Sequence, residues 1–175
     1  MNIFLVSDTH FGHQGVTQFL NNDGTKLRPW DNTFDMDEDL IENWNKVVRP
    51  KDKVYHLGDV VINRKALPTL ARLNGEKILI KGNHDIFRAE EYLAYFKDLR
   101  AYHVLDKFIL SHIPIHKNSI ERWSANIHGH LHSNRVTLED GSIDPKYICV
   151  CVEQTNFTPI SFEEVKYNWR ERSGL

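Results

Sequence analysis

The chain has 175 residues, the length of one ordinary domain, and we expect residues 1–175 to form a single domain. Its 22 basic and 24 acidic residues give a formal net charge of −2, which excludes a strongly basic surface for general nucleic-acid binding. With 41% hydrophobic and 26% charged residues, the chain is neither disordered nor of low complexity. Its ten histidines stand out, because histidine is the commonest metal ligand in proteins.

Short apolar runs alternate with amphipathic stretches along the chain. The apolar runs predict buried strands at residues 3–6, 54–57, 78–80, 108–110 and 147–152. The amphipathic stretches predict helices at residues 35–48, 65–73 and 89–96, and a last helix that begins at Ser161 with Glu164 in a capping box. Strands that alternate with helices predict βαβ units, so the expected fold class is α/β.

Three further features of the sequence limit the kind of protein that we expect. The first apolar run, residues 3–6, is too short for a signal-peptide core or a membrane span, so we expect a cytoplasmic protein without membrane contact. Cys149 and Cys151 are separated by one residue and cannot form a disulfide framework, so we expect reduced thiols. Residues 15–32 are polar and predict a long loop, and loops of this length are often functional.

Residue types that bind metals follow the predicted strands almost directly. In chain order they are Asp8 and His10, Asp59, Asn83 with His84 and Asp85, His112, and His130 with His132. Ligands bind at the carboxyl ends of the strands in open α/β sheets, so groups that are distant in sequence can converge there. Oxygen and nitrogen ligands without a thiolate suit Mn, Fe, Zn, Ni or Co. By contrast, His56 lies inside an apolar run and is predicted to be a hydrogen-bonded core histidine.

The ordered set of these blocks resembles the calcineurin-like metallophosphoesterase superfamily. The blocks are D-x-H at residues 8–10, G-D at 58–59, G-N-H-D at 82–85, His112, and G-H-x-H at 129–132. The motif S-D-T-H-F-G-H at residues 7–13 is also similar to the corresponding segment of small phosphoesterases of bacteria and their phages. The resemblance implies a four-layer αββα sandwich of two mixed β-sheets flanked by helices, of the metallo-dependent phosphatase type.

The resemblance also implies a dinuclear centre that holds two divalent metal ions. One ion would be held by Asp8, His10 and His132, and the other by Asn83, His112 and His130, with Asp59 as the bridging carboxylate. We expect Mn²⁺, with Fe, Ni, Co and Zn as alternatives. Two such cations neutralise phosphate oxygens and lower the pKa of a water molecule between them.

Four further residues are expected to act around the metals. By the resemblance, His84 would be the catalytic acid or a phosphate contact, and Asp85 would orient its ring. His13 lies on the polar loop beside the site and is a candidate phosphate contact. Arg28 lies on the same loop, and a guanidinium can grip two phosphate oxygens, so it is a candidate substrate clamp.

The predicted reaction is therefore hydrolysis of a small phosphate ester by a hydroxide that bridges two metals. The chain has no spare segment for a cap domain, so an open site is expected, and we favour phosphodiesters or small nucleotide-like esters. A phosphomonoesterase or a protein phosphatase remains an alternative on the same site. A nuclease and a non-catalytic metal-binding scaffold are further alternatives. The charge balance argues against the nuclease, and the His84–Asp85 pair argues against the scaffold.

Overall fold

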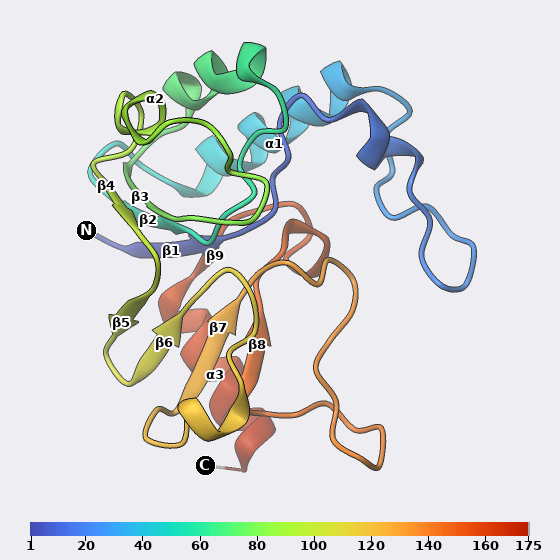
Figure 1. The fold of residues 1–175 in the computed structure, drawn as a ribbon, viewed down its shortest axis with the longest axis vertical. Coiled ribbons are helices and arrows are strands. Elements are labelled where there is room, and N and C mark those ends of the chain that lie inside the picture. The colour runs from blue at the N-terminus through green and yellow to red at the C-terminus, as the bar shows by residue number, and fades with distance from the viewer. Residues whose placement is uncertain (175) are drawn as a thin grey trace.

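The computed structural model describes residues 1–174, which form two β-sheets with flanking helices (Figure 1). In spatial order the first sheet contains β4 (Asp98–Arg100), β3 (Glu76–Ile80), β2 (Lys53–His56), β1 (Ile3–Val6) and β9 (Ile160–Ser161), of which only β9 is antiparallel. The second sheet contains β5 (His103–Leu105), β6 (Phe108–Leu110), β7 (Ala125–His128) and β8 (Tyr147–Cys149), of which only β5 is antiparallel. Both sheets are mixed, as predicted.

The register of the first sheet brings the carboxyl ends of its central strands to one edge. Val6 pairs with His56 across β1 and β2, and His56 pairs with Leu79 across β2 and β3. Because these strands are parallel, the segments that follow them leave the sheet side by side. Those segments carry the first three polar blocks that the sequence marks as metal-binding.

Helices cover the face of the first sheet that points away from the second sheet (Figure 1). The longest is α1 (Thr33–Val47), which turns Leu40 and Trp44 into the core from one face. The 3-10 helix η2 (Arg64–Arg72) and the short helix α2 (Ala89–Leu93) extend the same layer. The first sheet is thus held from outside by an apolar cluster that leaves its carboxyl edge clear.

The inner faces of the two sheets share one apolar cluster. Leu5 of β1 packs there with Phe108 of β6 and Ile127 of β7, and α3 (Phe162–Ser173) adds Val165. These residues alternate along their strands with residues that point to the opposite face. The sheets are therefore fixed against each other, which fixes the distance between the loops at their shared edge.

The outer face of the second sheet is covered by much less helix than the outer face of the first sheet. Ile109 lies on that face and packs against Ile120 and Tyr147. Ile120 directly follows a single turn of 3-10 helix, η3 (Lys117–Ser119). The fold is the expected α/β class of two mixed sheets with flanking helices, but the helical layers on the two outer faces are unequal.

Some predicted elements differ in their details. The helix predicted at residues 65–73 is the 3-10 helix η2, and Pro68 in its interior lacks the N–H group that an α-helix would use. α2 ends at Leu93, three residues before its predicted end. The last helix starts as predicted, with Ser161 Oγ accepting a hydrogen bond from the Glu164 N–H. Within residues 1–174, no helix has both the length and the apolar composition needed to cross a membrane.

Candidate metal centre

The predicted metal ligands converge at the carboxyl edge of the first sheet. Six side chains form two groups, and within each group the potential ligand atoms lie within 4.8 Å of one another. The first ligand group is Asp8, His10 and His132, and the second ligand group is Asp59, His112 and His130. The two groups divide the histidines of the G-H-x-H block, with His132 in the first group and His130 in the second.

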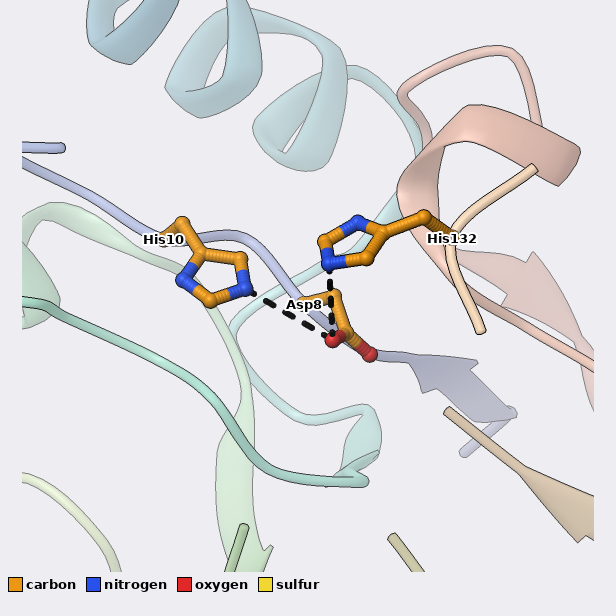
Figure 2. Close-up of side chains that lie close together, drawn as sticks. All are labelled: Asp8, His10 and His132. Atoms are coloured by element: carbon orange, nitrogen blue, oxygen red, sulfur yellow. Dashed lines mark ion pairs between the residues drawn. The ribbon is translucent and has the colours of Figure 1, made fainter. Parts of the chain in front are cut away.

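The two carboxylate oxygens of Asp8 have different surroundings. Oδ2 accepts hydrogen bonds from Ser7 Oγ at 2.6 Å and from Cys151 Sγ, a free thiol as predicted, at 3.2 Å. Oδ1 is buried and has no hydrogen-bond partner among the described residues. It faces His10 Nε2 at 3.6 Å and His132 Nε2 at 3.8 Å (Figure 2). One oxygen is thus held by the protein, and the other is directed into the ligand group.

The unpaired atoms of the first ligand group fit a cation. Both ring nitrogens of His10 are also buried without a hydrogen-bond partner in residues 1–174, an arrangement that proteins generally avoid. The 3.6–3.8 Å separations are too long for hydrogen bonds. They match the spacing of two ligand atoms that each lie about 2.1 Å from one shared cation. The residues of this group therefore suit a divalent metal ion.

A backbone carbonyl fixes the ring of His112 in the second ligand group. His112 Nδ1 donates a hydrogen bond to Leu57 O at 2.7 Å, which turns Nε2 toward Asp59 Oδ2 at 3.4 Å. Asn83 Oδ1 lies 2.8 Å from the same Nε2. Asn83 Oδ1 is an acceptor, and Nε2 is also an acceptor when the ring is neutral with its proton on Nδ1. This close approach therefore requires a proton or a cation between the two atoms. His130 completes the group from an exposed position.

Asp59 lies between the two ligand groups. Its Oδ2 is 3.7 Å from His10 Nε2 and 3.4 Å from His112 Nε2, so one oxygen faces ligands of both groups. Its Oδ1 accepts a hydrogen bond from the His84 N–H at 2.8 Å. This placement fits the bridging position that the family resemblance assigns to Asp59.

The backbone is left-handed at five of the six residues in the two groups. Their φ angles are 59° at Asp8, 51° at His10, 56° at Asp59, 68° at His130 and 52° at His132. Only three other non-glycine residues within 1–174 have positive φ. Such conformations cost about 1–3 kcal/mol each and concentrate at functional sites. The chain is strained where it aims these side chains.

Two glycines let neighbouring segments approach the carboxylates closely. A Cβ atom on Gly82 would lie 2.2 Å from Asp59 Oδ1, and one on Gly129 would lie 2.5 Å from Asp8 Oδ2. Both distances are shorter than any real contact, so a side chain would displace a carboxylate. The close approach of Gly129 also brings the His130 N–H to 2.8 Å from Asp8 Oδ2.

The electrostatics of the site keep its carboxylates ionised. Burial raises the pKa of Asp8, but the close approach and charge of His10 outweigh this effect and hold the pKa well below its usual range. At Asp59, burial is likewise outweighed by His112, and the pKa is lowered. Burial lowers the pKa of His132, but the hydrogen bond and charge of Glu153 raise it overall. Negative charge is thus retained at both ligand groups.

The amino-acid sequence matches a known family over most of its length. Residues 1–147 match the calcineurin-like phosphoesterase superfamily domain. The chain belongs to this superfamily. An uncharacterized protein of Methanocaldococcus jannaschii is 39% identical over 171 residues, which cover 92% of this chain and 87% of that protein.

One of the similar solved structures shares the overall fold of this chain. A protein of unknown function from Aquifex aeolicus is 28% identical and superposes with a TM-score of 0.69, covering 95% of this chain and 98% of that one. A structure described as a novel archaeal phosphodiesterase is 20% identical, with a TM-score of 0.46 over 86% of this chain and 82% of that one. The Aquifex structure supports the calcineurin-like fold of two mixed sheets with flanking helices.

Two histidines of this calcineurin-like domain stand beside the first ligand group without joining it. The ring centroids of His84 and His13 each lie 5.7 Å from the ring centroid of His10. His84 is exposed. His13 is half-buried and caps the short helix η1 (Gln14–Gln18), where its Nδ1 accepts a hydrogen bond from the Val16 N–H. Both are close to the centre, where the sequence expects substrate.

Asp85 does not orient the ring of His84, which corrects the prediction. Its buried carboxylate accepts hydrogen bonds from the backbone N–H groups of Asp59 at 2.8 Å, Val60 at 2.9 Å and Gly82 at 2.8 Å. The physical reason is that the two turns point three N–H groups inward, and one carboxylate satisfies all of them. Asp85 therefore ties the loop after β2 to the loop after β3.

The prediction that Arg28 clamps phosphate is wrong. The side chain is fully buried, and its guanidinium donates hydrogen bonds to Thr9 O at 2.8 Å, to Asp8 O and to Glu153 Oε1 at 2.8 Å. The left-handed turn at residues 8–10 leaves two inward carbonyls, and arginine supplies enough donors for both carbonyls and a buried carboxylate. Arg28 supports the backbone of the first ligand group.

Glu153 is a site residue that was not predicted. Its Oε1 accepts hydrogen bonds from Arg28 and, at 3.0 Å, from His132 Nδ1, which leaves His132 Nε2 facing Asp8. A signal for it exists in the sequence. Glu153 directly follows the apolar run at residues 147–152, just as the other polar blocks follow theirs.

Proposed function

We propose that this protein hydrolyses phosphate esters at a dinuclear metal centre, with phosphodiesters or small nucleotide-like esters as its substrates. The observation that carries the proposal is the pair of ligand groups that meet at Asp59 Oδ2, beside an exposed histidine that belongs to neither group. A structural metal site is closed by its protein ligands, whereas this one has an open side.

The residues would divide the binding of two ions between them. Asp8, His10 and His132 would hold one divalent cation, and Asn83, His112 and His130 would hold the other, with Asp59 in contact with both. When bound, Mn²⁺ or a similar ion supplies positive charge to the phosphate oxygens and lowers the pKa of water. The exposure of Asn83 and His130 supports access of a substrate to this side.

In the proposed reaction, a water molecule releases a proton to solvent as its oxygen forms a bond to phosphorus, and the bond from phosphorus to the leaving oxygen breaks. The leaving oxygen then takes a proton, and His84 is placed to give it. Its backbone N–H is anchored on Asp59 Oδ1, and its ring is exposed beside His10. General acids of this kind typically contribute about 10²- to 10⁴-fold to the rate.

His13 is proposed to bind a phosphate oxygen. Because its Nδ1 accepts the Val16 N–H, the proton of the neutral ring is on Nε2, which is then a hydrogen-bond donor. Burial and the charge of His10 lower the pKa of His13, so the ring stays neutral near pH 7. A neutral donor can contact the substrate without repelling the two cations.

The direct test is metal analysis followed by a substrate panel. Protein loaded with Mn²⁺, Ni²⁺ or Co²⁺ is assayed with a bis-aryl phosphodiester, an aryl phosphomonoester and a cyclic nucleotide. We expect two ions per chain and the fastest hydrolysis with a diester. Absence of hydrolysis with every metal and substrate would refute the proposed hydrolase activity. Faster hydrolysis of the monoester than of the diesters would refute the diester preference.

A matched pair of variants controls this experiment. Asp59→Asn is expected to abolish hydrolysis and reduce metal content. Asp106→Asn changes the same residue type at a similar φ, 55° against 56°, but in the turn between β5 and β6. It should retain full activity, so a loss in both variants would point to a general defect in folding instead of a role for Asp59.

A further inference from the structure

A groove opens directly beside the second ligand group. It has a volume of about 890 Å³, and Asn83 and His112 form part of its wall. Volumes of about 300–1,000 Å³ are typical of pockets that hold small-molecule ligands. The groove is therefore continuous with the candidate metal centre, and a substrate bound there would extend into it.

The wall of this groove is largely apolar and in part strongly exposed. Tyr102 is 60% exposed and Ile113 is 54% exposed, while Ile109 and Ile115 lie deeper. Large apolar side chains that gather at the surface often mark a binding site. Here they gather on one side of the metal centre, which indicates an apolar part of the ligand on that side.

Two of the residues that line the groove, Lys81 and Arg100, carry a formal charge when histidine is neutral. Lys81 is exposed there, and Arg100 is half-buried and paired with Asp98 at 2.6 Å. A polymer of phosphates would need a longer track of cations than these two. The charge distribution thus fits one substituent of a single phosphate ester better than an extended nucleic-acid strand.

We infer that this groove binds an aromatic substituent of the phosphate ester, such as an aryl ring or a nucleobase. The inference rests on the proposed function, because it places the phosphate at the two ligand groups. Tyr102 has an aromatic ring, and aromatic rings stack favourably on other planar rings, whatever their substituents. Tyr102 and Ile113 are then specificity-determining residues for the group attached to phosphorus.

The test measures equilibrium binding, so that it does not depend on turnover. Calorimetric titration of metal-loaded protein compares diphenyl, dicyclohexyl and dimethyl phosphate, which share one charge but differ in their substituents. We expect the tightest binding for diphenyl phosphate and the weakest for dimethyl phosphate. Equal affinity for diphenyl and dicyclohexyl phosphate would overturn the aromatic assignment.

Variants locate the binding to the groove. Tyr102→Ala is expected to weaken diphenyl phosphate binding about tenfold and to leave dimethyl phosphate within twofold of the wild type. Ile113→Ala should act in the same direction. Tyr167→Ala is the matched control, since Tyr167 is 62% exposed but lies on α3, outside the groove. An equal effect of Tyr102→Ala and Tyr167→Ala would overturn the inference.

The outcomes separate this inference from the proposed function. Hydrolysis of the substrate panel that does not depend on Tyr102 would refute the binding role of the groove but would support the proposed hydrolase activity. Binding of diphenyl phosphate that depends on Tyr102, without hydrolysis of any ester, would refute the hydrolase activity but would support the binding role of the groove. A wild-type dimer that Tyr102→Ala converts to monomers would assign the groove to a second copy of the chain and overturn the inference.

Discussion

The two ligand groups share Asp59 but are built in different ways. In the first group, Asp8 and His10 are almost completely buried, and Arg28 and Glu153 support the backbone of Asp8 and the ring of His132. In the second group, the ring of His130 is exposed, and the support for His112 is a backbone carbonyl. One group is embedded in a buried polar network, and the other stands at the surface beside a groove.

This difference indicates a division of labour between holding a cation and admitting a ligand. Buried ligands that are already held in place reorganise little when a metal binds, so we expect the first group to bind its ion more tightly. The ligands of the second group are supported by fewer side chains and are more accessible to solvent. We expect its ion to exchange faster and its neighbours to control which esters enter.

The strongest test of the comparison uses the two histidines of one turn. His130→Ala and His132→Ala remove ligands that are two residues apart and both have left-handed backbone, but that belong to different groups. Each should lower hydrolysis roughly a thousandfold, because one cation is lost in either case. Metal titration should find the tighter site in His130→Ala and only the weaker one in His132→Ala. Loss of the same site in both variants would contradict two separate groups.

His84 stands beside the first ligand group but belongs to neither group, so it should affect metal binding at neither of them. His84→Ala is expected to retain both metal ions and to slow hydrolysis of esters with poor leaving groups about 10²- to 10⁴-fold. Esters with good leaving groups need little proton donation and should be affected less. Kinetics across a series of leaving groups measures this difference, and unchanged turnover of the poorest leaving group would rule out the proposed acid.

Glu153 should affect the first group alone. Glu153→Gln keeps the size of the side chain but removes the charge that holds Arg28 and His132. We expect the affinity of the first group for metal to fall about 10- to 100-fold and that of the second group to stay unchanged. Competition with a chromophoric chelator measures both affinities. Glu171→Gln, on the exposed face of α3, is the control, and equal losses at both groups would argue against local support.

The smallest expected effect concerns the packing behind the first group. His56 is fully buried, its Nε2 lies 2.9 Å from Thr9 Oγ1, and burial lowers its pKa from 6.5 to about 3. The unfolded chain therefore binds a proton here that the folded chain does not, and stability falls as the pH drops below about 6.5. The expected slope is about 1.4 kcal/mol per pH unit.

Urea unfolding of the metal-free protein between pH 7 and pH 4 measures this slope. His56→Gln should be less stable at pH 7 but should lose less stability on acidification. The exposed His116→Gln variant controls for the removal of one histidine. The same pH dependence in wild type and His56→Gln would show that His56 is not the responsible group.

Much of this arrangement could be predicted from local sequence. The apolar runs predict the central strands, and each polar block follows the carboxyl end of a run, which is where parallel strands place ligands. His56 inside a run is correctly predicted as a hydrogen-bonded core residue. The family pattern implies that His130 and His132 serve different ions, and in the structure the two side chains lie in different ligand groups.

The errors concern contacts between segments that are far apart in the chain. Arg28 lies in a polar loop, where exposure is the usual outcome, and nothing nearby indicates that Glu153 will lie against it. Asp85 sits next to His84 in sequence, but its hydrogen-bond partners are set by the turn after β2. Propensity and motif describe which residues meet at an edge, whereas burial decides which of them remain available to a ligand.

The pairing of Arg28 with Glu153 also constrains when the site can form during synthesis. The two residues are 125 positions apart. At about 5–20 residues per second, a ribosome needs roughly 6 to 25 seconds to travel from one to the other. Until then the nascent chain contains Arg28 without the carboxylate that pairs with it in the folded structure. The first ligand group can therefore reach its folded arrangement only after residue 153 has been translated, and we expect a metal ion to bind it no earlier than that.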